Sequence, residues 1–279
     1  MEKSKDFTLA YSPCPNDTFI FYNMVHKQLF SGFSIKEELH DVEKLNQSAK
    51  VGLYDSTKLS FFAYFHVLDK YKLLNSGSAL GSGCGPLIVK KKGKQIGDLK
   101  GKNILVPGLL TTANLLTNVY LSSKFTPIPL RYDLIMDKIL SDEYEAGVII
   151  HEERFTYEKR GLEKIVDLGD FWEGTYGHPI PLGAISIKKS IDTVVQKSFD
   201  SVIKKSLEMA YSNPHEAKSY ILENAQEKDE NVVQSHIDLY VNNYSLDLGE
   251  KGKRAIEFLL EKALSLDLLK IKREESLFI

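Results

Sequence analysis

The chain has 279 residues, which suits one large domain or two modest ones built around a sizeable core. Its composition, 43% hydrophobic and 27% charged, is typical of a folded protein and argues against disorder. A formal net charge of −2 argues against a nucleic-acid partner, and no apolar run is long enough for a membrane span, so we expect neither interaction.

The two cysteines, Cys14 and Cys84, are too few for a disulfide framework and form no CxxC motif. A reducing compartment fits best, although a single bridge is also compatible with this count. The N-terminus is charged and lacks the apolar segment of a secretion signal, so we expect a soluble, cytoplasmic protein. The sequence does not determine the oligomeric state.

The first half of the chain alternates between strands and helices. Residues 6–12 alternate in polarity like a strand, and the Asn-Asp-Thr run at 16–18 can cap the helix that follows. The other expected elements are strands at 33–38, 71–76 and 85–91, a strand and a polar break within 51–59, helices at 41–50 and from about Ser60, and a glycine-rich segment at 79–86.

The pattern restarts after residue 93 and ends in a helical tail. From 190 to 275, apolar residues three and four apart predict helices. Two rounds of alternation predict an α/β protein with two lobes, parallel sheets covered by helices, and a ligand in the cleft between the lobes. The chain should cross between lobes near 86–92 and 180–188. The expected strands lie at 101–108, 127–133, 146–151 and 180–189, and the expected helices at 111–123 and 134–144.

Three junctions between elements carry candidate ligand-binding residues. Open α/β sheets bind ligands beyond the carboxyl ends of their strands, where helix N-termini present free N–H groups and a partial positive charge. An anion such as a carboxylate fits there, although each junction could be only a helix cap. Lys58 could add charge or simply face solvent. The junctions are Asn16-Asp17-Thr18, Lys58-Leu59-Ser60 and Thr111-Thr112-Ala113.

The paired threonines of the third junction are unusual for a plain cap, since one hydroxyl is enough to cap a helix. We therefore expect the second hydroxyl, together with the backbone amides of Thr112 and Ala113, to hold a carboxylate. Which of the three junctions binds it stays open.

His151 ends the apolar run 148–150, which is typical of a buried strand. Because histidine titrates near neutrality, this ring suits proton transfer, and the alternative is a capping or packing role. The sequence HEERF lacks the second histidine of HExxH, so we expect no metal. His26 and His66 should be structural or exposed, whereas His178 could reach the cleft from a loop.

Other catalytic motifs are absent. The segment 81–85 does not complete a GxGxxG, and neither a Walker A motif nor a GxSxG elbow occurs. Cys14 lies just before a predicted helix N-terminus, where a thiolate would be favoured. No histidine is assigned as its partner, so we expect Cys14 and Cys84 to be small buried hydrophobic residues.

Six sequence blocks in order along nearly the whole chain resemble the 1,4-dihydroxy-6-naphthoate synthase family, which acts in the futalosine route to menaquinone. The blocks are SPCPNDTFIFYNMVH (12–26), DSTKLSFFAYFHVL (55–68), SGSALGSGCGPLIV (76–89), VPGLLTTANLL (106–116), AGVIIHEERFTY (146–157) and YVNNYSLDLGEKGKRAI (240–256). The blocks at 12–26 and 146–157 are the most specific for the family.

The resemblance implies a type 2 periplasmic-binding-protein-like α/β fold. Its lobes would be 1–88 with 185–279, and 89–184. It also implies a carbon–carbon lyase that needs no cofactor. This enzyme would convert cyclic dehypoxanthine futalosine into 1,4-dihydroxy-6-naphthoate and release the ribose-derived fragment.

Site roles also follow from the resemblance. The family's catalytic base falls on His151, and its ligand contacts fall on Lys58-Leu59-Ser60 and on Thr112-Ala113, which we expect to face each other across the cleft. Glu153 departs from the serine of the family block, and it could either alter the pKa of the base or face solvent.

Three other functions stay open at this stage, and one of them is an enzyme-like regulator that binds a metabolite and a partner protein. A non-catalytic binding protein for small carboxylates has the same fold, but it would need an export signal or a lipid anchor, and we find neither. Chorismate dehydratase, an enzyme of the same pathway, shares the fold, but the SPCPNDTF and IIHE blocks argue against it.

Overall fold

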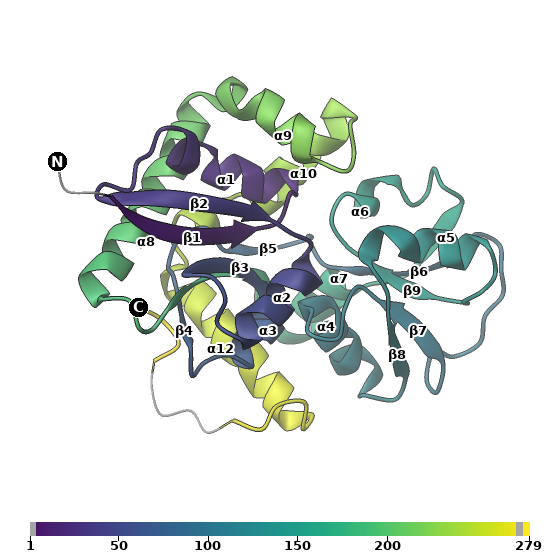
Figure 1. Cartoon of the computed structure of the whole chain (residues 1–279). Helices are drawn as coiled ribbons and strands as arrows, with labels where there is room; N and C mark the ends of the chain where they lie inside the picture. The colour runs from purple at the N-terminus through teal and green to yellow at the C-terminus, as the bar shows by residue number, and fades with distance from the viewer. Residues whose placement is uncertain (1–3, 272–275) are drawn as a thin grey trace.

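The computed structural model describes residues 4–271 and 276–279, whose strands form two separate sheets (Figure 1). We call them sheet A, with the order β2-β1-β3-β11-β4 and β5 paired with β11, and sheet B, with the order β10-β6-β9-β7-β8. Sheet A contains β1 (Lys5–Tyr11), β2 (Phe33–Leu39), β3 (Ser56–Ser60), β4 (Tyr71–Leu73), β5 (Ala79–Gly81) and β11 (Ile180–Lys188). Sheet B contains β6 (Leu87–Lys91), β7 (Asn103–Val106), β8 (Thr126–Pro129), β9 (Gly147–Ile149) and β10 (Leu162–Asp167).

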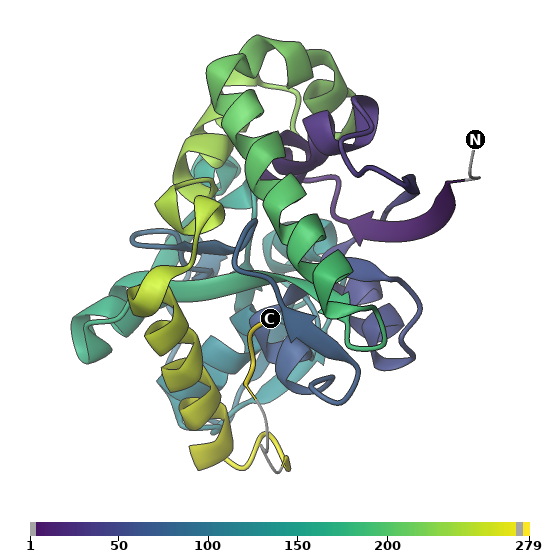
Figure 2. The ribbon, with the colours of Figure 1, turned by 90° about the vertical axis from the view of Figure 1, so that its left-hand side faces the viewer.

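Helices pack around both sheets, and Figure 2 shows the long helix α8 crossing in front of sheet A. Helix α1 packs against α8, α9 and α10, whereas α12 contacts α3, α4 and β11. The helices with sheet A are α1 (Pro15–His26), α2 (Val42–Lys50), α3 (Phe61–Phe65), α8 (Thr193–Ser212), α9 (Lys218–Asn224), α10 (Glu230–Tyr240), α11 (Asn243–Leu246) and α12 (Gly249–Ser265). The helices between the strands of sheet B and before β11 are α4 (Thr112–Leu121), α5 (Ile135–Leu140), α6 (Glu153–Thr156) and α7 (Leu168–Tyr176), and short 3-10 turns span Tyr132–Leu134 and Pro214–Ala217.

Both sheets are mixed, so the expectation of wholly parallel sheets was wrong. Strand β1 is parallel to β2 and β3, and β7 is parallel to β8 and β9. In contrast, β11 is antiparallel to β3, β4 and β5, and β6 is antiparallel to β9 and β10. A parallel neighbour needs a crossover connection, usually a helix. The chain enters β6 from β5 of sheet A, and it enters β11 from sheet B, so neither strand is reached by a crossover within its own sheet.

The two sheets take their strands from different parts of the chain. Sheet A uses 5–81 and 180–188, and sheet B uses 87–167. The chain therefore passes from A to B between β5 and β6, and returns before β11. The division into lobes 1–88 with 185–279, and 89–184, stays a prediction, and its boundaries fall within β6 and β11.

Some expected elements differ from the observed ones. The polar residues of 51–59, expected as a break, form the fully buried strand β3, because their side chains bond to neighbours: Ser56 Oγ donates to the carbonyl of Ser186 at 2.9 Å. Helix α1 begins at Pro15, before the expected cap at 16–18, since proline is favoured in the first helical turn. Strand β10 and helix α7 were not predicted. Residues 1–3, and 272–275 of the expected helical tail, lie outside the described residues.

The core of each sheet is built from the apolar faces of its strands and helices. Trp172 of α7 and Tyr64 of α3 are fully buried in one cluster, and Phe199 of α8 is fully buried in another. Phe278, from the last described segment, forms an isolated parallel bridge with Leu73 at the edge strand β4, which protects that edge. None of the helices in 4–271 and 276–279 combines the length and apolar character needed to cross a bilayer.

Candidate active site

A pocket between the two sheets collects the residues that the sequence singled out. Its empty volume is about 710 Å³, counting the mouth that opens to solvent. Both sheets contribute, because the carboxyl ends of β1 and β3 in sheet A and of β7 and β9 in sheet B lead into its lining. His178 lies elsewhere, with its ring packed against Phe258. The predicted site residues that line the pocket are Asn16, Asp17, Lys58, Leu59, Ser60, Thr111, Thr112, Ala113 and His151.

His151 lies between β9 and α6 and borders the pocket with its ring. Its backbone φ is 56°, a left-handed conformation that residues other than glycine rarely adopt and that is found at functional sites. Burial lowers the pKa of His151 to about 4; Lys58 adds to this effect, and Asp17 opposes it. The imidazole is therefore neutral at pH 7 and has a lone pair to accept a proton.

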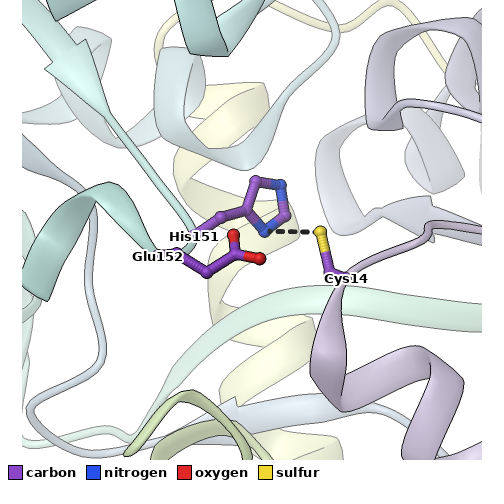
Figure 3. A group of neighbouring side chains, drawn as sticks. All are labelled: Cys14, His151 and Glu152. Atoms are coloured by element: carbon purple, nitrogen blue, oxygen red, sulfur yellow. Dashed lines mark hydrogen bonds between the residues drawn. The ribbon is translucent and has the colours of Figure 1, made fainter. Parts of the chain in front are cut away.

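Cys14 contacts His151, so it is more than the small buried hydrophobic residue we expected. Its Sγ lies 3.4 Å from His151 Nδ1, as Figure 3 shows. The carboxylate of Glu152 lies beside the same edge of the ring, and Nε2 points away from it (Figure 3). Burial raises the pKa of the Cys14 thiol well above its usual value and that of Glu152 to about 7.

Lys58 does not face solvent but forms a buried ion pair with Asp17 from the other predicted junction of sheet A. Lys58 Nζ lies 2.6 Å from Asp17 Oδ1, and the two residues are 6% and 1% exposed. Asp17 also accepts from Asn16 Nδ2 and from the amide and hydroxyl of Ser12. Asp17 and Asn16 therefore do not cap α1. A cation and an anion together line this wall of the pocket, so its net charge is close to zero.

Gly183 of β11 lies against the Lys58 side chain. A Cβ at Gly183 would lie 2.7 Å from Lys58 Cε, closer than real side-chain contacts allow. The absence of a side chain at Gly183 thus leaves room for Lys58 to reach Asp17.

The N-terminus of α4 lies against the start of α3, which directly follows the end of β3. Thr111 Oγ1 caps α4 by accepting from the amide of Asn114. The sequence suggested that the Thr112 hydroxyl is free to bind a ligand, but it already has two partners. It donates to the carbonyl of Leu182 at 2.9 Å and accepts from the amide of Phe62 at 3.4 Å. The first amides of a helix have no acceptor within the helix, so those of Thr112 and Ala113 are the donors this junction offers.

Ser60 ends β3 and precedes α3, and its hydroxyl does not cap that helix. Asn46 of α2 holds it instead: its Oδ1 accepts from the Ser60 amide at 3.0 Å, and its Nδ2 donates to the Ser60 hydroxyl at 3.3 Å. This pair fixes the end of β3 beside the pocket.

His236 of α10 is a pocket residue that the sequence did not reveal. Its Nε2 lies 2.9 Å from Asn16 Oδ1, and its ring stacks on that of His151 with centroids 6.2 Å apart. Burial lowers the pKa of His236 well below its usual value, so this ring is also neutral. No local pattern marks it, because it lies inside an ordinary amphipathic helix. Cys14 did carry a signal, since it follows β1 at the same kind of junction as the other site residues.

Glu153, which we expected either to alter the pKa of the base or to face solvent, does not face solvent. It is buried, and burial raises its pKa well above the usual value for a carboxyl group. It is not among the residues that line the pocket.

Solved structures share the fold. A protein from Archaeoglobus fulgidus superposes with a TM-score of 0.89 and 34% identity, covering 95% of this chain and 98% of its own. The alkanesulfonate-binding protein SsuA from Xanthomonas axonopodis gives a TM-score of 0.75 at 13% identity, covering 97% and 96%. The second similarity shows that the fold is that of the periplasmic binding proteins.

Sequence comparison identifies the family. The profile of a family described as menaquinone biosynthesis matches residues 7–265. A 1,4-dihydroxy-6-naphthoate synthase from Thermus thermophilus is 44% identical over 255 residues, which are 91% of this chain and 93% of that protein. Another, from Streptomyces coelicolor, is 36% identical over 260 residues, 91% and 92% of the two chains. The chain therefore belongs to the menaquinone biosynthesis family, among the enzymes called 1,4-dihydroxy-6-naphthoate synthases.

Proposed function

We propose that this enzyme converts cyclic dehypoxanthine futalosine into 1,4-dihydroxy-6-naphthoate by breaking a carbon–carbon bond and releasing the ribose-derived fragment. The observation that carries the proposal is the neutral imidazole of His151, which borders a pocket between the two sheets. Relatives at 44% and 36% identity carry the corresponding name.

His151 is the general base in this proposal. Its Nδ1 faces Cys14 and Glu152, so Nε2 is the nitrogen available to a substrate. It takes a proton from a hydroxyl or an acidic carbon, and the electron pair left behind drives cleavage of the neighbouring carbon–carbon bond. The imidazolium that forms lies near the carboxylates of Glu152 and Asp17, which favour its positive charge.

The substrate carries a carboxylate, which we place at the N-terminus of α4. The amides of Thr112 and Ala113 donate to it, and the helix dipole favours its charge. The carbonyl of the substrate accepts the electrons released by bond cleavage, so the proposed reaction uses no cofactor. Closing of the two lobes around the bound substrate would exclude water from the reacting atoms.

The direct test is to incubate the purified protein with cyclic dehypoxanthine futalosine and to follow the naphthoate by absorbance and mass. We expect His151→Asn to lower the turnover number by about 10²–10⁴-fold, the usual contribution of a general base. His178→Asn is the matched control, since this histidine lies outside the pocket, and it should keep normal turnover.

Two outcomes would contradict the proposal. Near-normal turnover of His151→Asn would exclude the assigned base. Binding of the substrate without conversion would instead favour a non-catalytic binding protein of the same fold.

A further inference from the structure

Glu152 is buried without the partners that a buried carboxylate normally has. It is 4% exposed, and neither of its carboxylate oxygens has a hydrogen-bond partner within residues 4–271 and 276–279. Buried polar groups are nearly always hydrogen-bonded, so an unpartnered carboxylate calls for an explanation, such as an ion. Figure 3 shows this carboxylate directed toward the space between His151 and Cys14.

These three side chains lie close enough together to bind one metal ion. One ligand atom from each of Cys14, His151 and Glu152 lies within 4.8 Å of the other two. A zinc ion bound at 2.3 Å by sulfur and at 2.0–2.1 Å by nitrogen in a tetrahedral arrangement separates those ligands by about 3.5 Å. The distance between Cys14 Sγ and His151 Nδ1 is 3.4 Å.

We propose that Cys14, His151 and Glu152 form an inhibitory binding site for a thiophilic divalent cation, of which zinc fits best. Thiolate and imidazole ligands select zinc over magnesium or calcium, which prefer oxygen. Three protein ligands leave the fourth position of a tetrahedral ion for water. The site is therefore complete enough to bind zinc tightly without any further side chain.

Zinc at this site would block the proposed chemistry in two ways. Coordination displaces the Cys14 thiol proton to solvent and occupies the lone pair of His151 Nδ1, so the neutral ring carries its proton on Nε2 and no longer acts as a base. The ion also ties Cys14, next to sheet A, to two residues next to sheet B, which holds the pocket closed. The inhibition rests on the proposed function, whereas the binding of zinc does not.

The binding test uses reduced, tag-free protein titrated with zinc in competition with a chromophoric chelator. We expect one tight site per chain. Cobalt in place of zinc should give the near-ultraviolet thiolate-to-metal absorption band, which Cys14→Ser removes. Cys14→Ser and Glu152→Gln should each weaken zinc binding by at least about tenfold, because even residues that only orient metal ligands typically contribute 10–100-fold. Cys84→Ser is the matched control and should keep both the affinity and the band.

The inference fails if the protein binds no zinc, if cobalt gives no thiolate band, or if Glu152→Gln binds zinc as tightly as the unchanged protein. The Glu152 variant keeps the test decisive should Cys14→Ser fail to fold. In the activity arm, zinc should abolish naphthoate formation and a chelator should restore it. Zinc binding by a protein that lacks synthase activity would refute the proposed function and leave the metal site standing.

Discussion

Replacing Asp17 by asparagine tests the buried ion pair that forms one wall of the pocket. The substitution keeps the size of the side chain but removes the charge that faces Lys58 Nζ at 2.6 Å. It also places an amide group where the carboxylate accepts from Asn16 and Ser12. The lysine then stays buried beside Gly183 without a counter-charge.

The expected loss of stability is large because both partners are almost completely buried. Removing one member of a buried ion pair costs about 3–5 kcal/mol. Since 1 kcal/mol shifts the melting temperature of a chain of this size class by about 2–4 °C, the variant should melt roughly 6–20 °C lower. Asp142→Asn is the matched control. It removes an exposed carboxylate that pairs with Lys91 and Lys94, and it should leave the melting temperature nearly unchanged.

Calorimetry of Asp17→Asn, Lys58→Met and the double variant measures the interaction energy between the two side chains separately from the contacts that each makes with other residues. Replacing both partners removes the unpaired charge, so the double variant should be more stable than Asp17→Asn alone. The reasoning is refuted if Asp17→Asn melts within about 2 °C of the unchanged protein, or if the two substitutions simply add.

Three other predictions concern titration and close packing. The acid limb of the pH profile of kcat/KM should report His151 near pH 4, since the neutral ring is the base, and a limb near 6.5 would contradict this. Burial raises the pKa of Glu152 from 4.5 to about 7, so ionisation of this group destabilises the fold as pH rises through this range. The free energy of unfolding of Glu152→Gln, measured with urea, should therefore exceed that of the unchanged protein by up to roughly 3 kcal/mol at pH 8, and the two should be equal at pH 4.5. Gly85→Ala should destabilise the protein by about 1–3 kcal/mol or more in the same assay, because the new Cβ would lie 2.1 Å from the amide nitrogen of Gly169. Gly97→Ala is the control and should leave stability unchanged, because a Cβ added there would have no neighbouring heavy atom within 4 Å.

Local patterns in the sequence singled out candidate residues at junctions that the structure brings to one pocket. The alternation of strands and helices predicted an α/β protein, which the two sheets confirm. It also placed His151 after a buried strand and Thr112 at the start of a helix, as observed. These features depend on residues close in sequence, whose periodicity and capping preferences follow from backbone geometry.

The tertiary structure alone decided which side chains meet. Cys14 reaches His151 across 137 residues of chain, and Asn16 reaches His236 across 220. The same holds for β3, whose polar residues predicted a break in the strand. The ion pair between Lys58 and Asp17 of α1, and the hydrogen bond from Ser56 to β11, compensate the burial of these residues. Such contacts depend on how the chain crosses between the two sheets. Local propensity contains no information about that path, because the contact energies arise only when distant segments pack together.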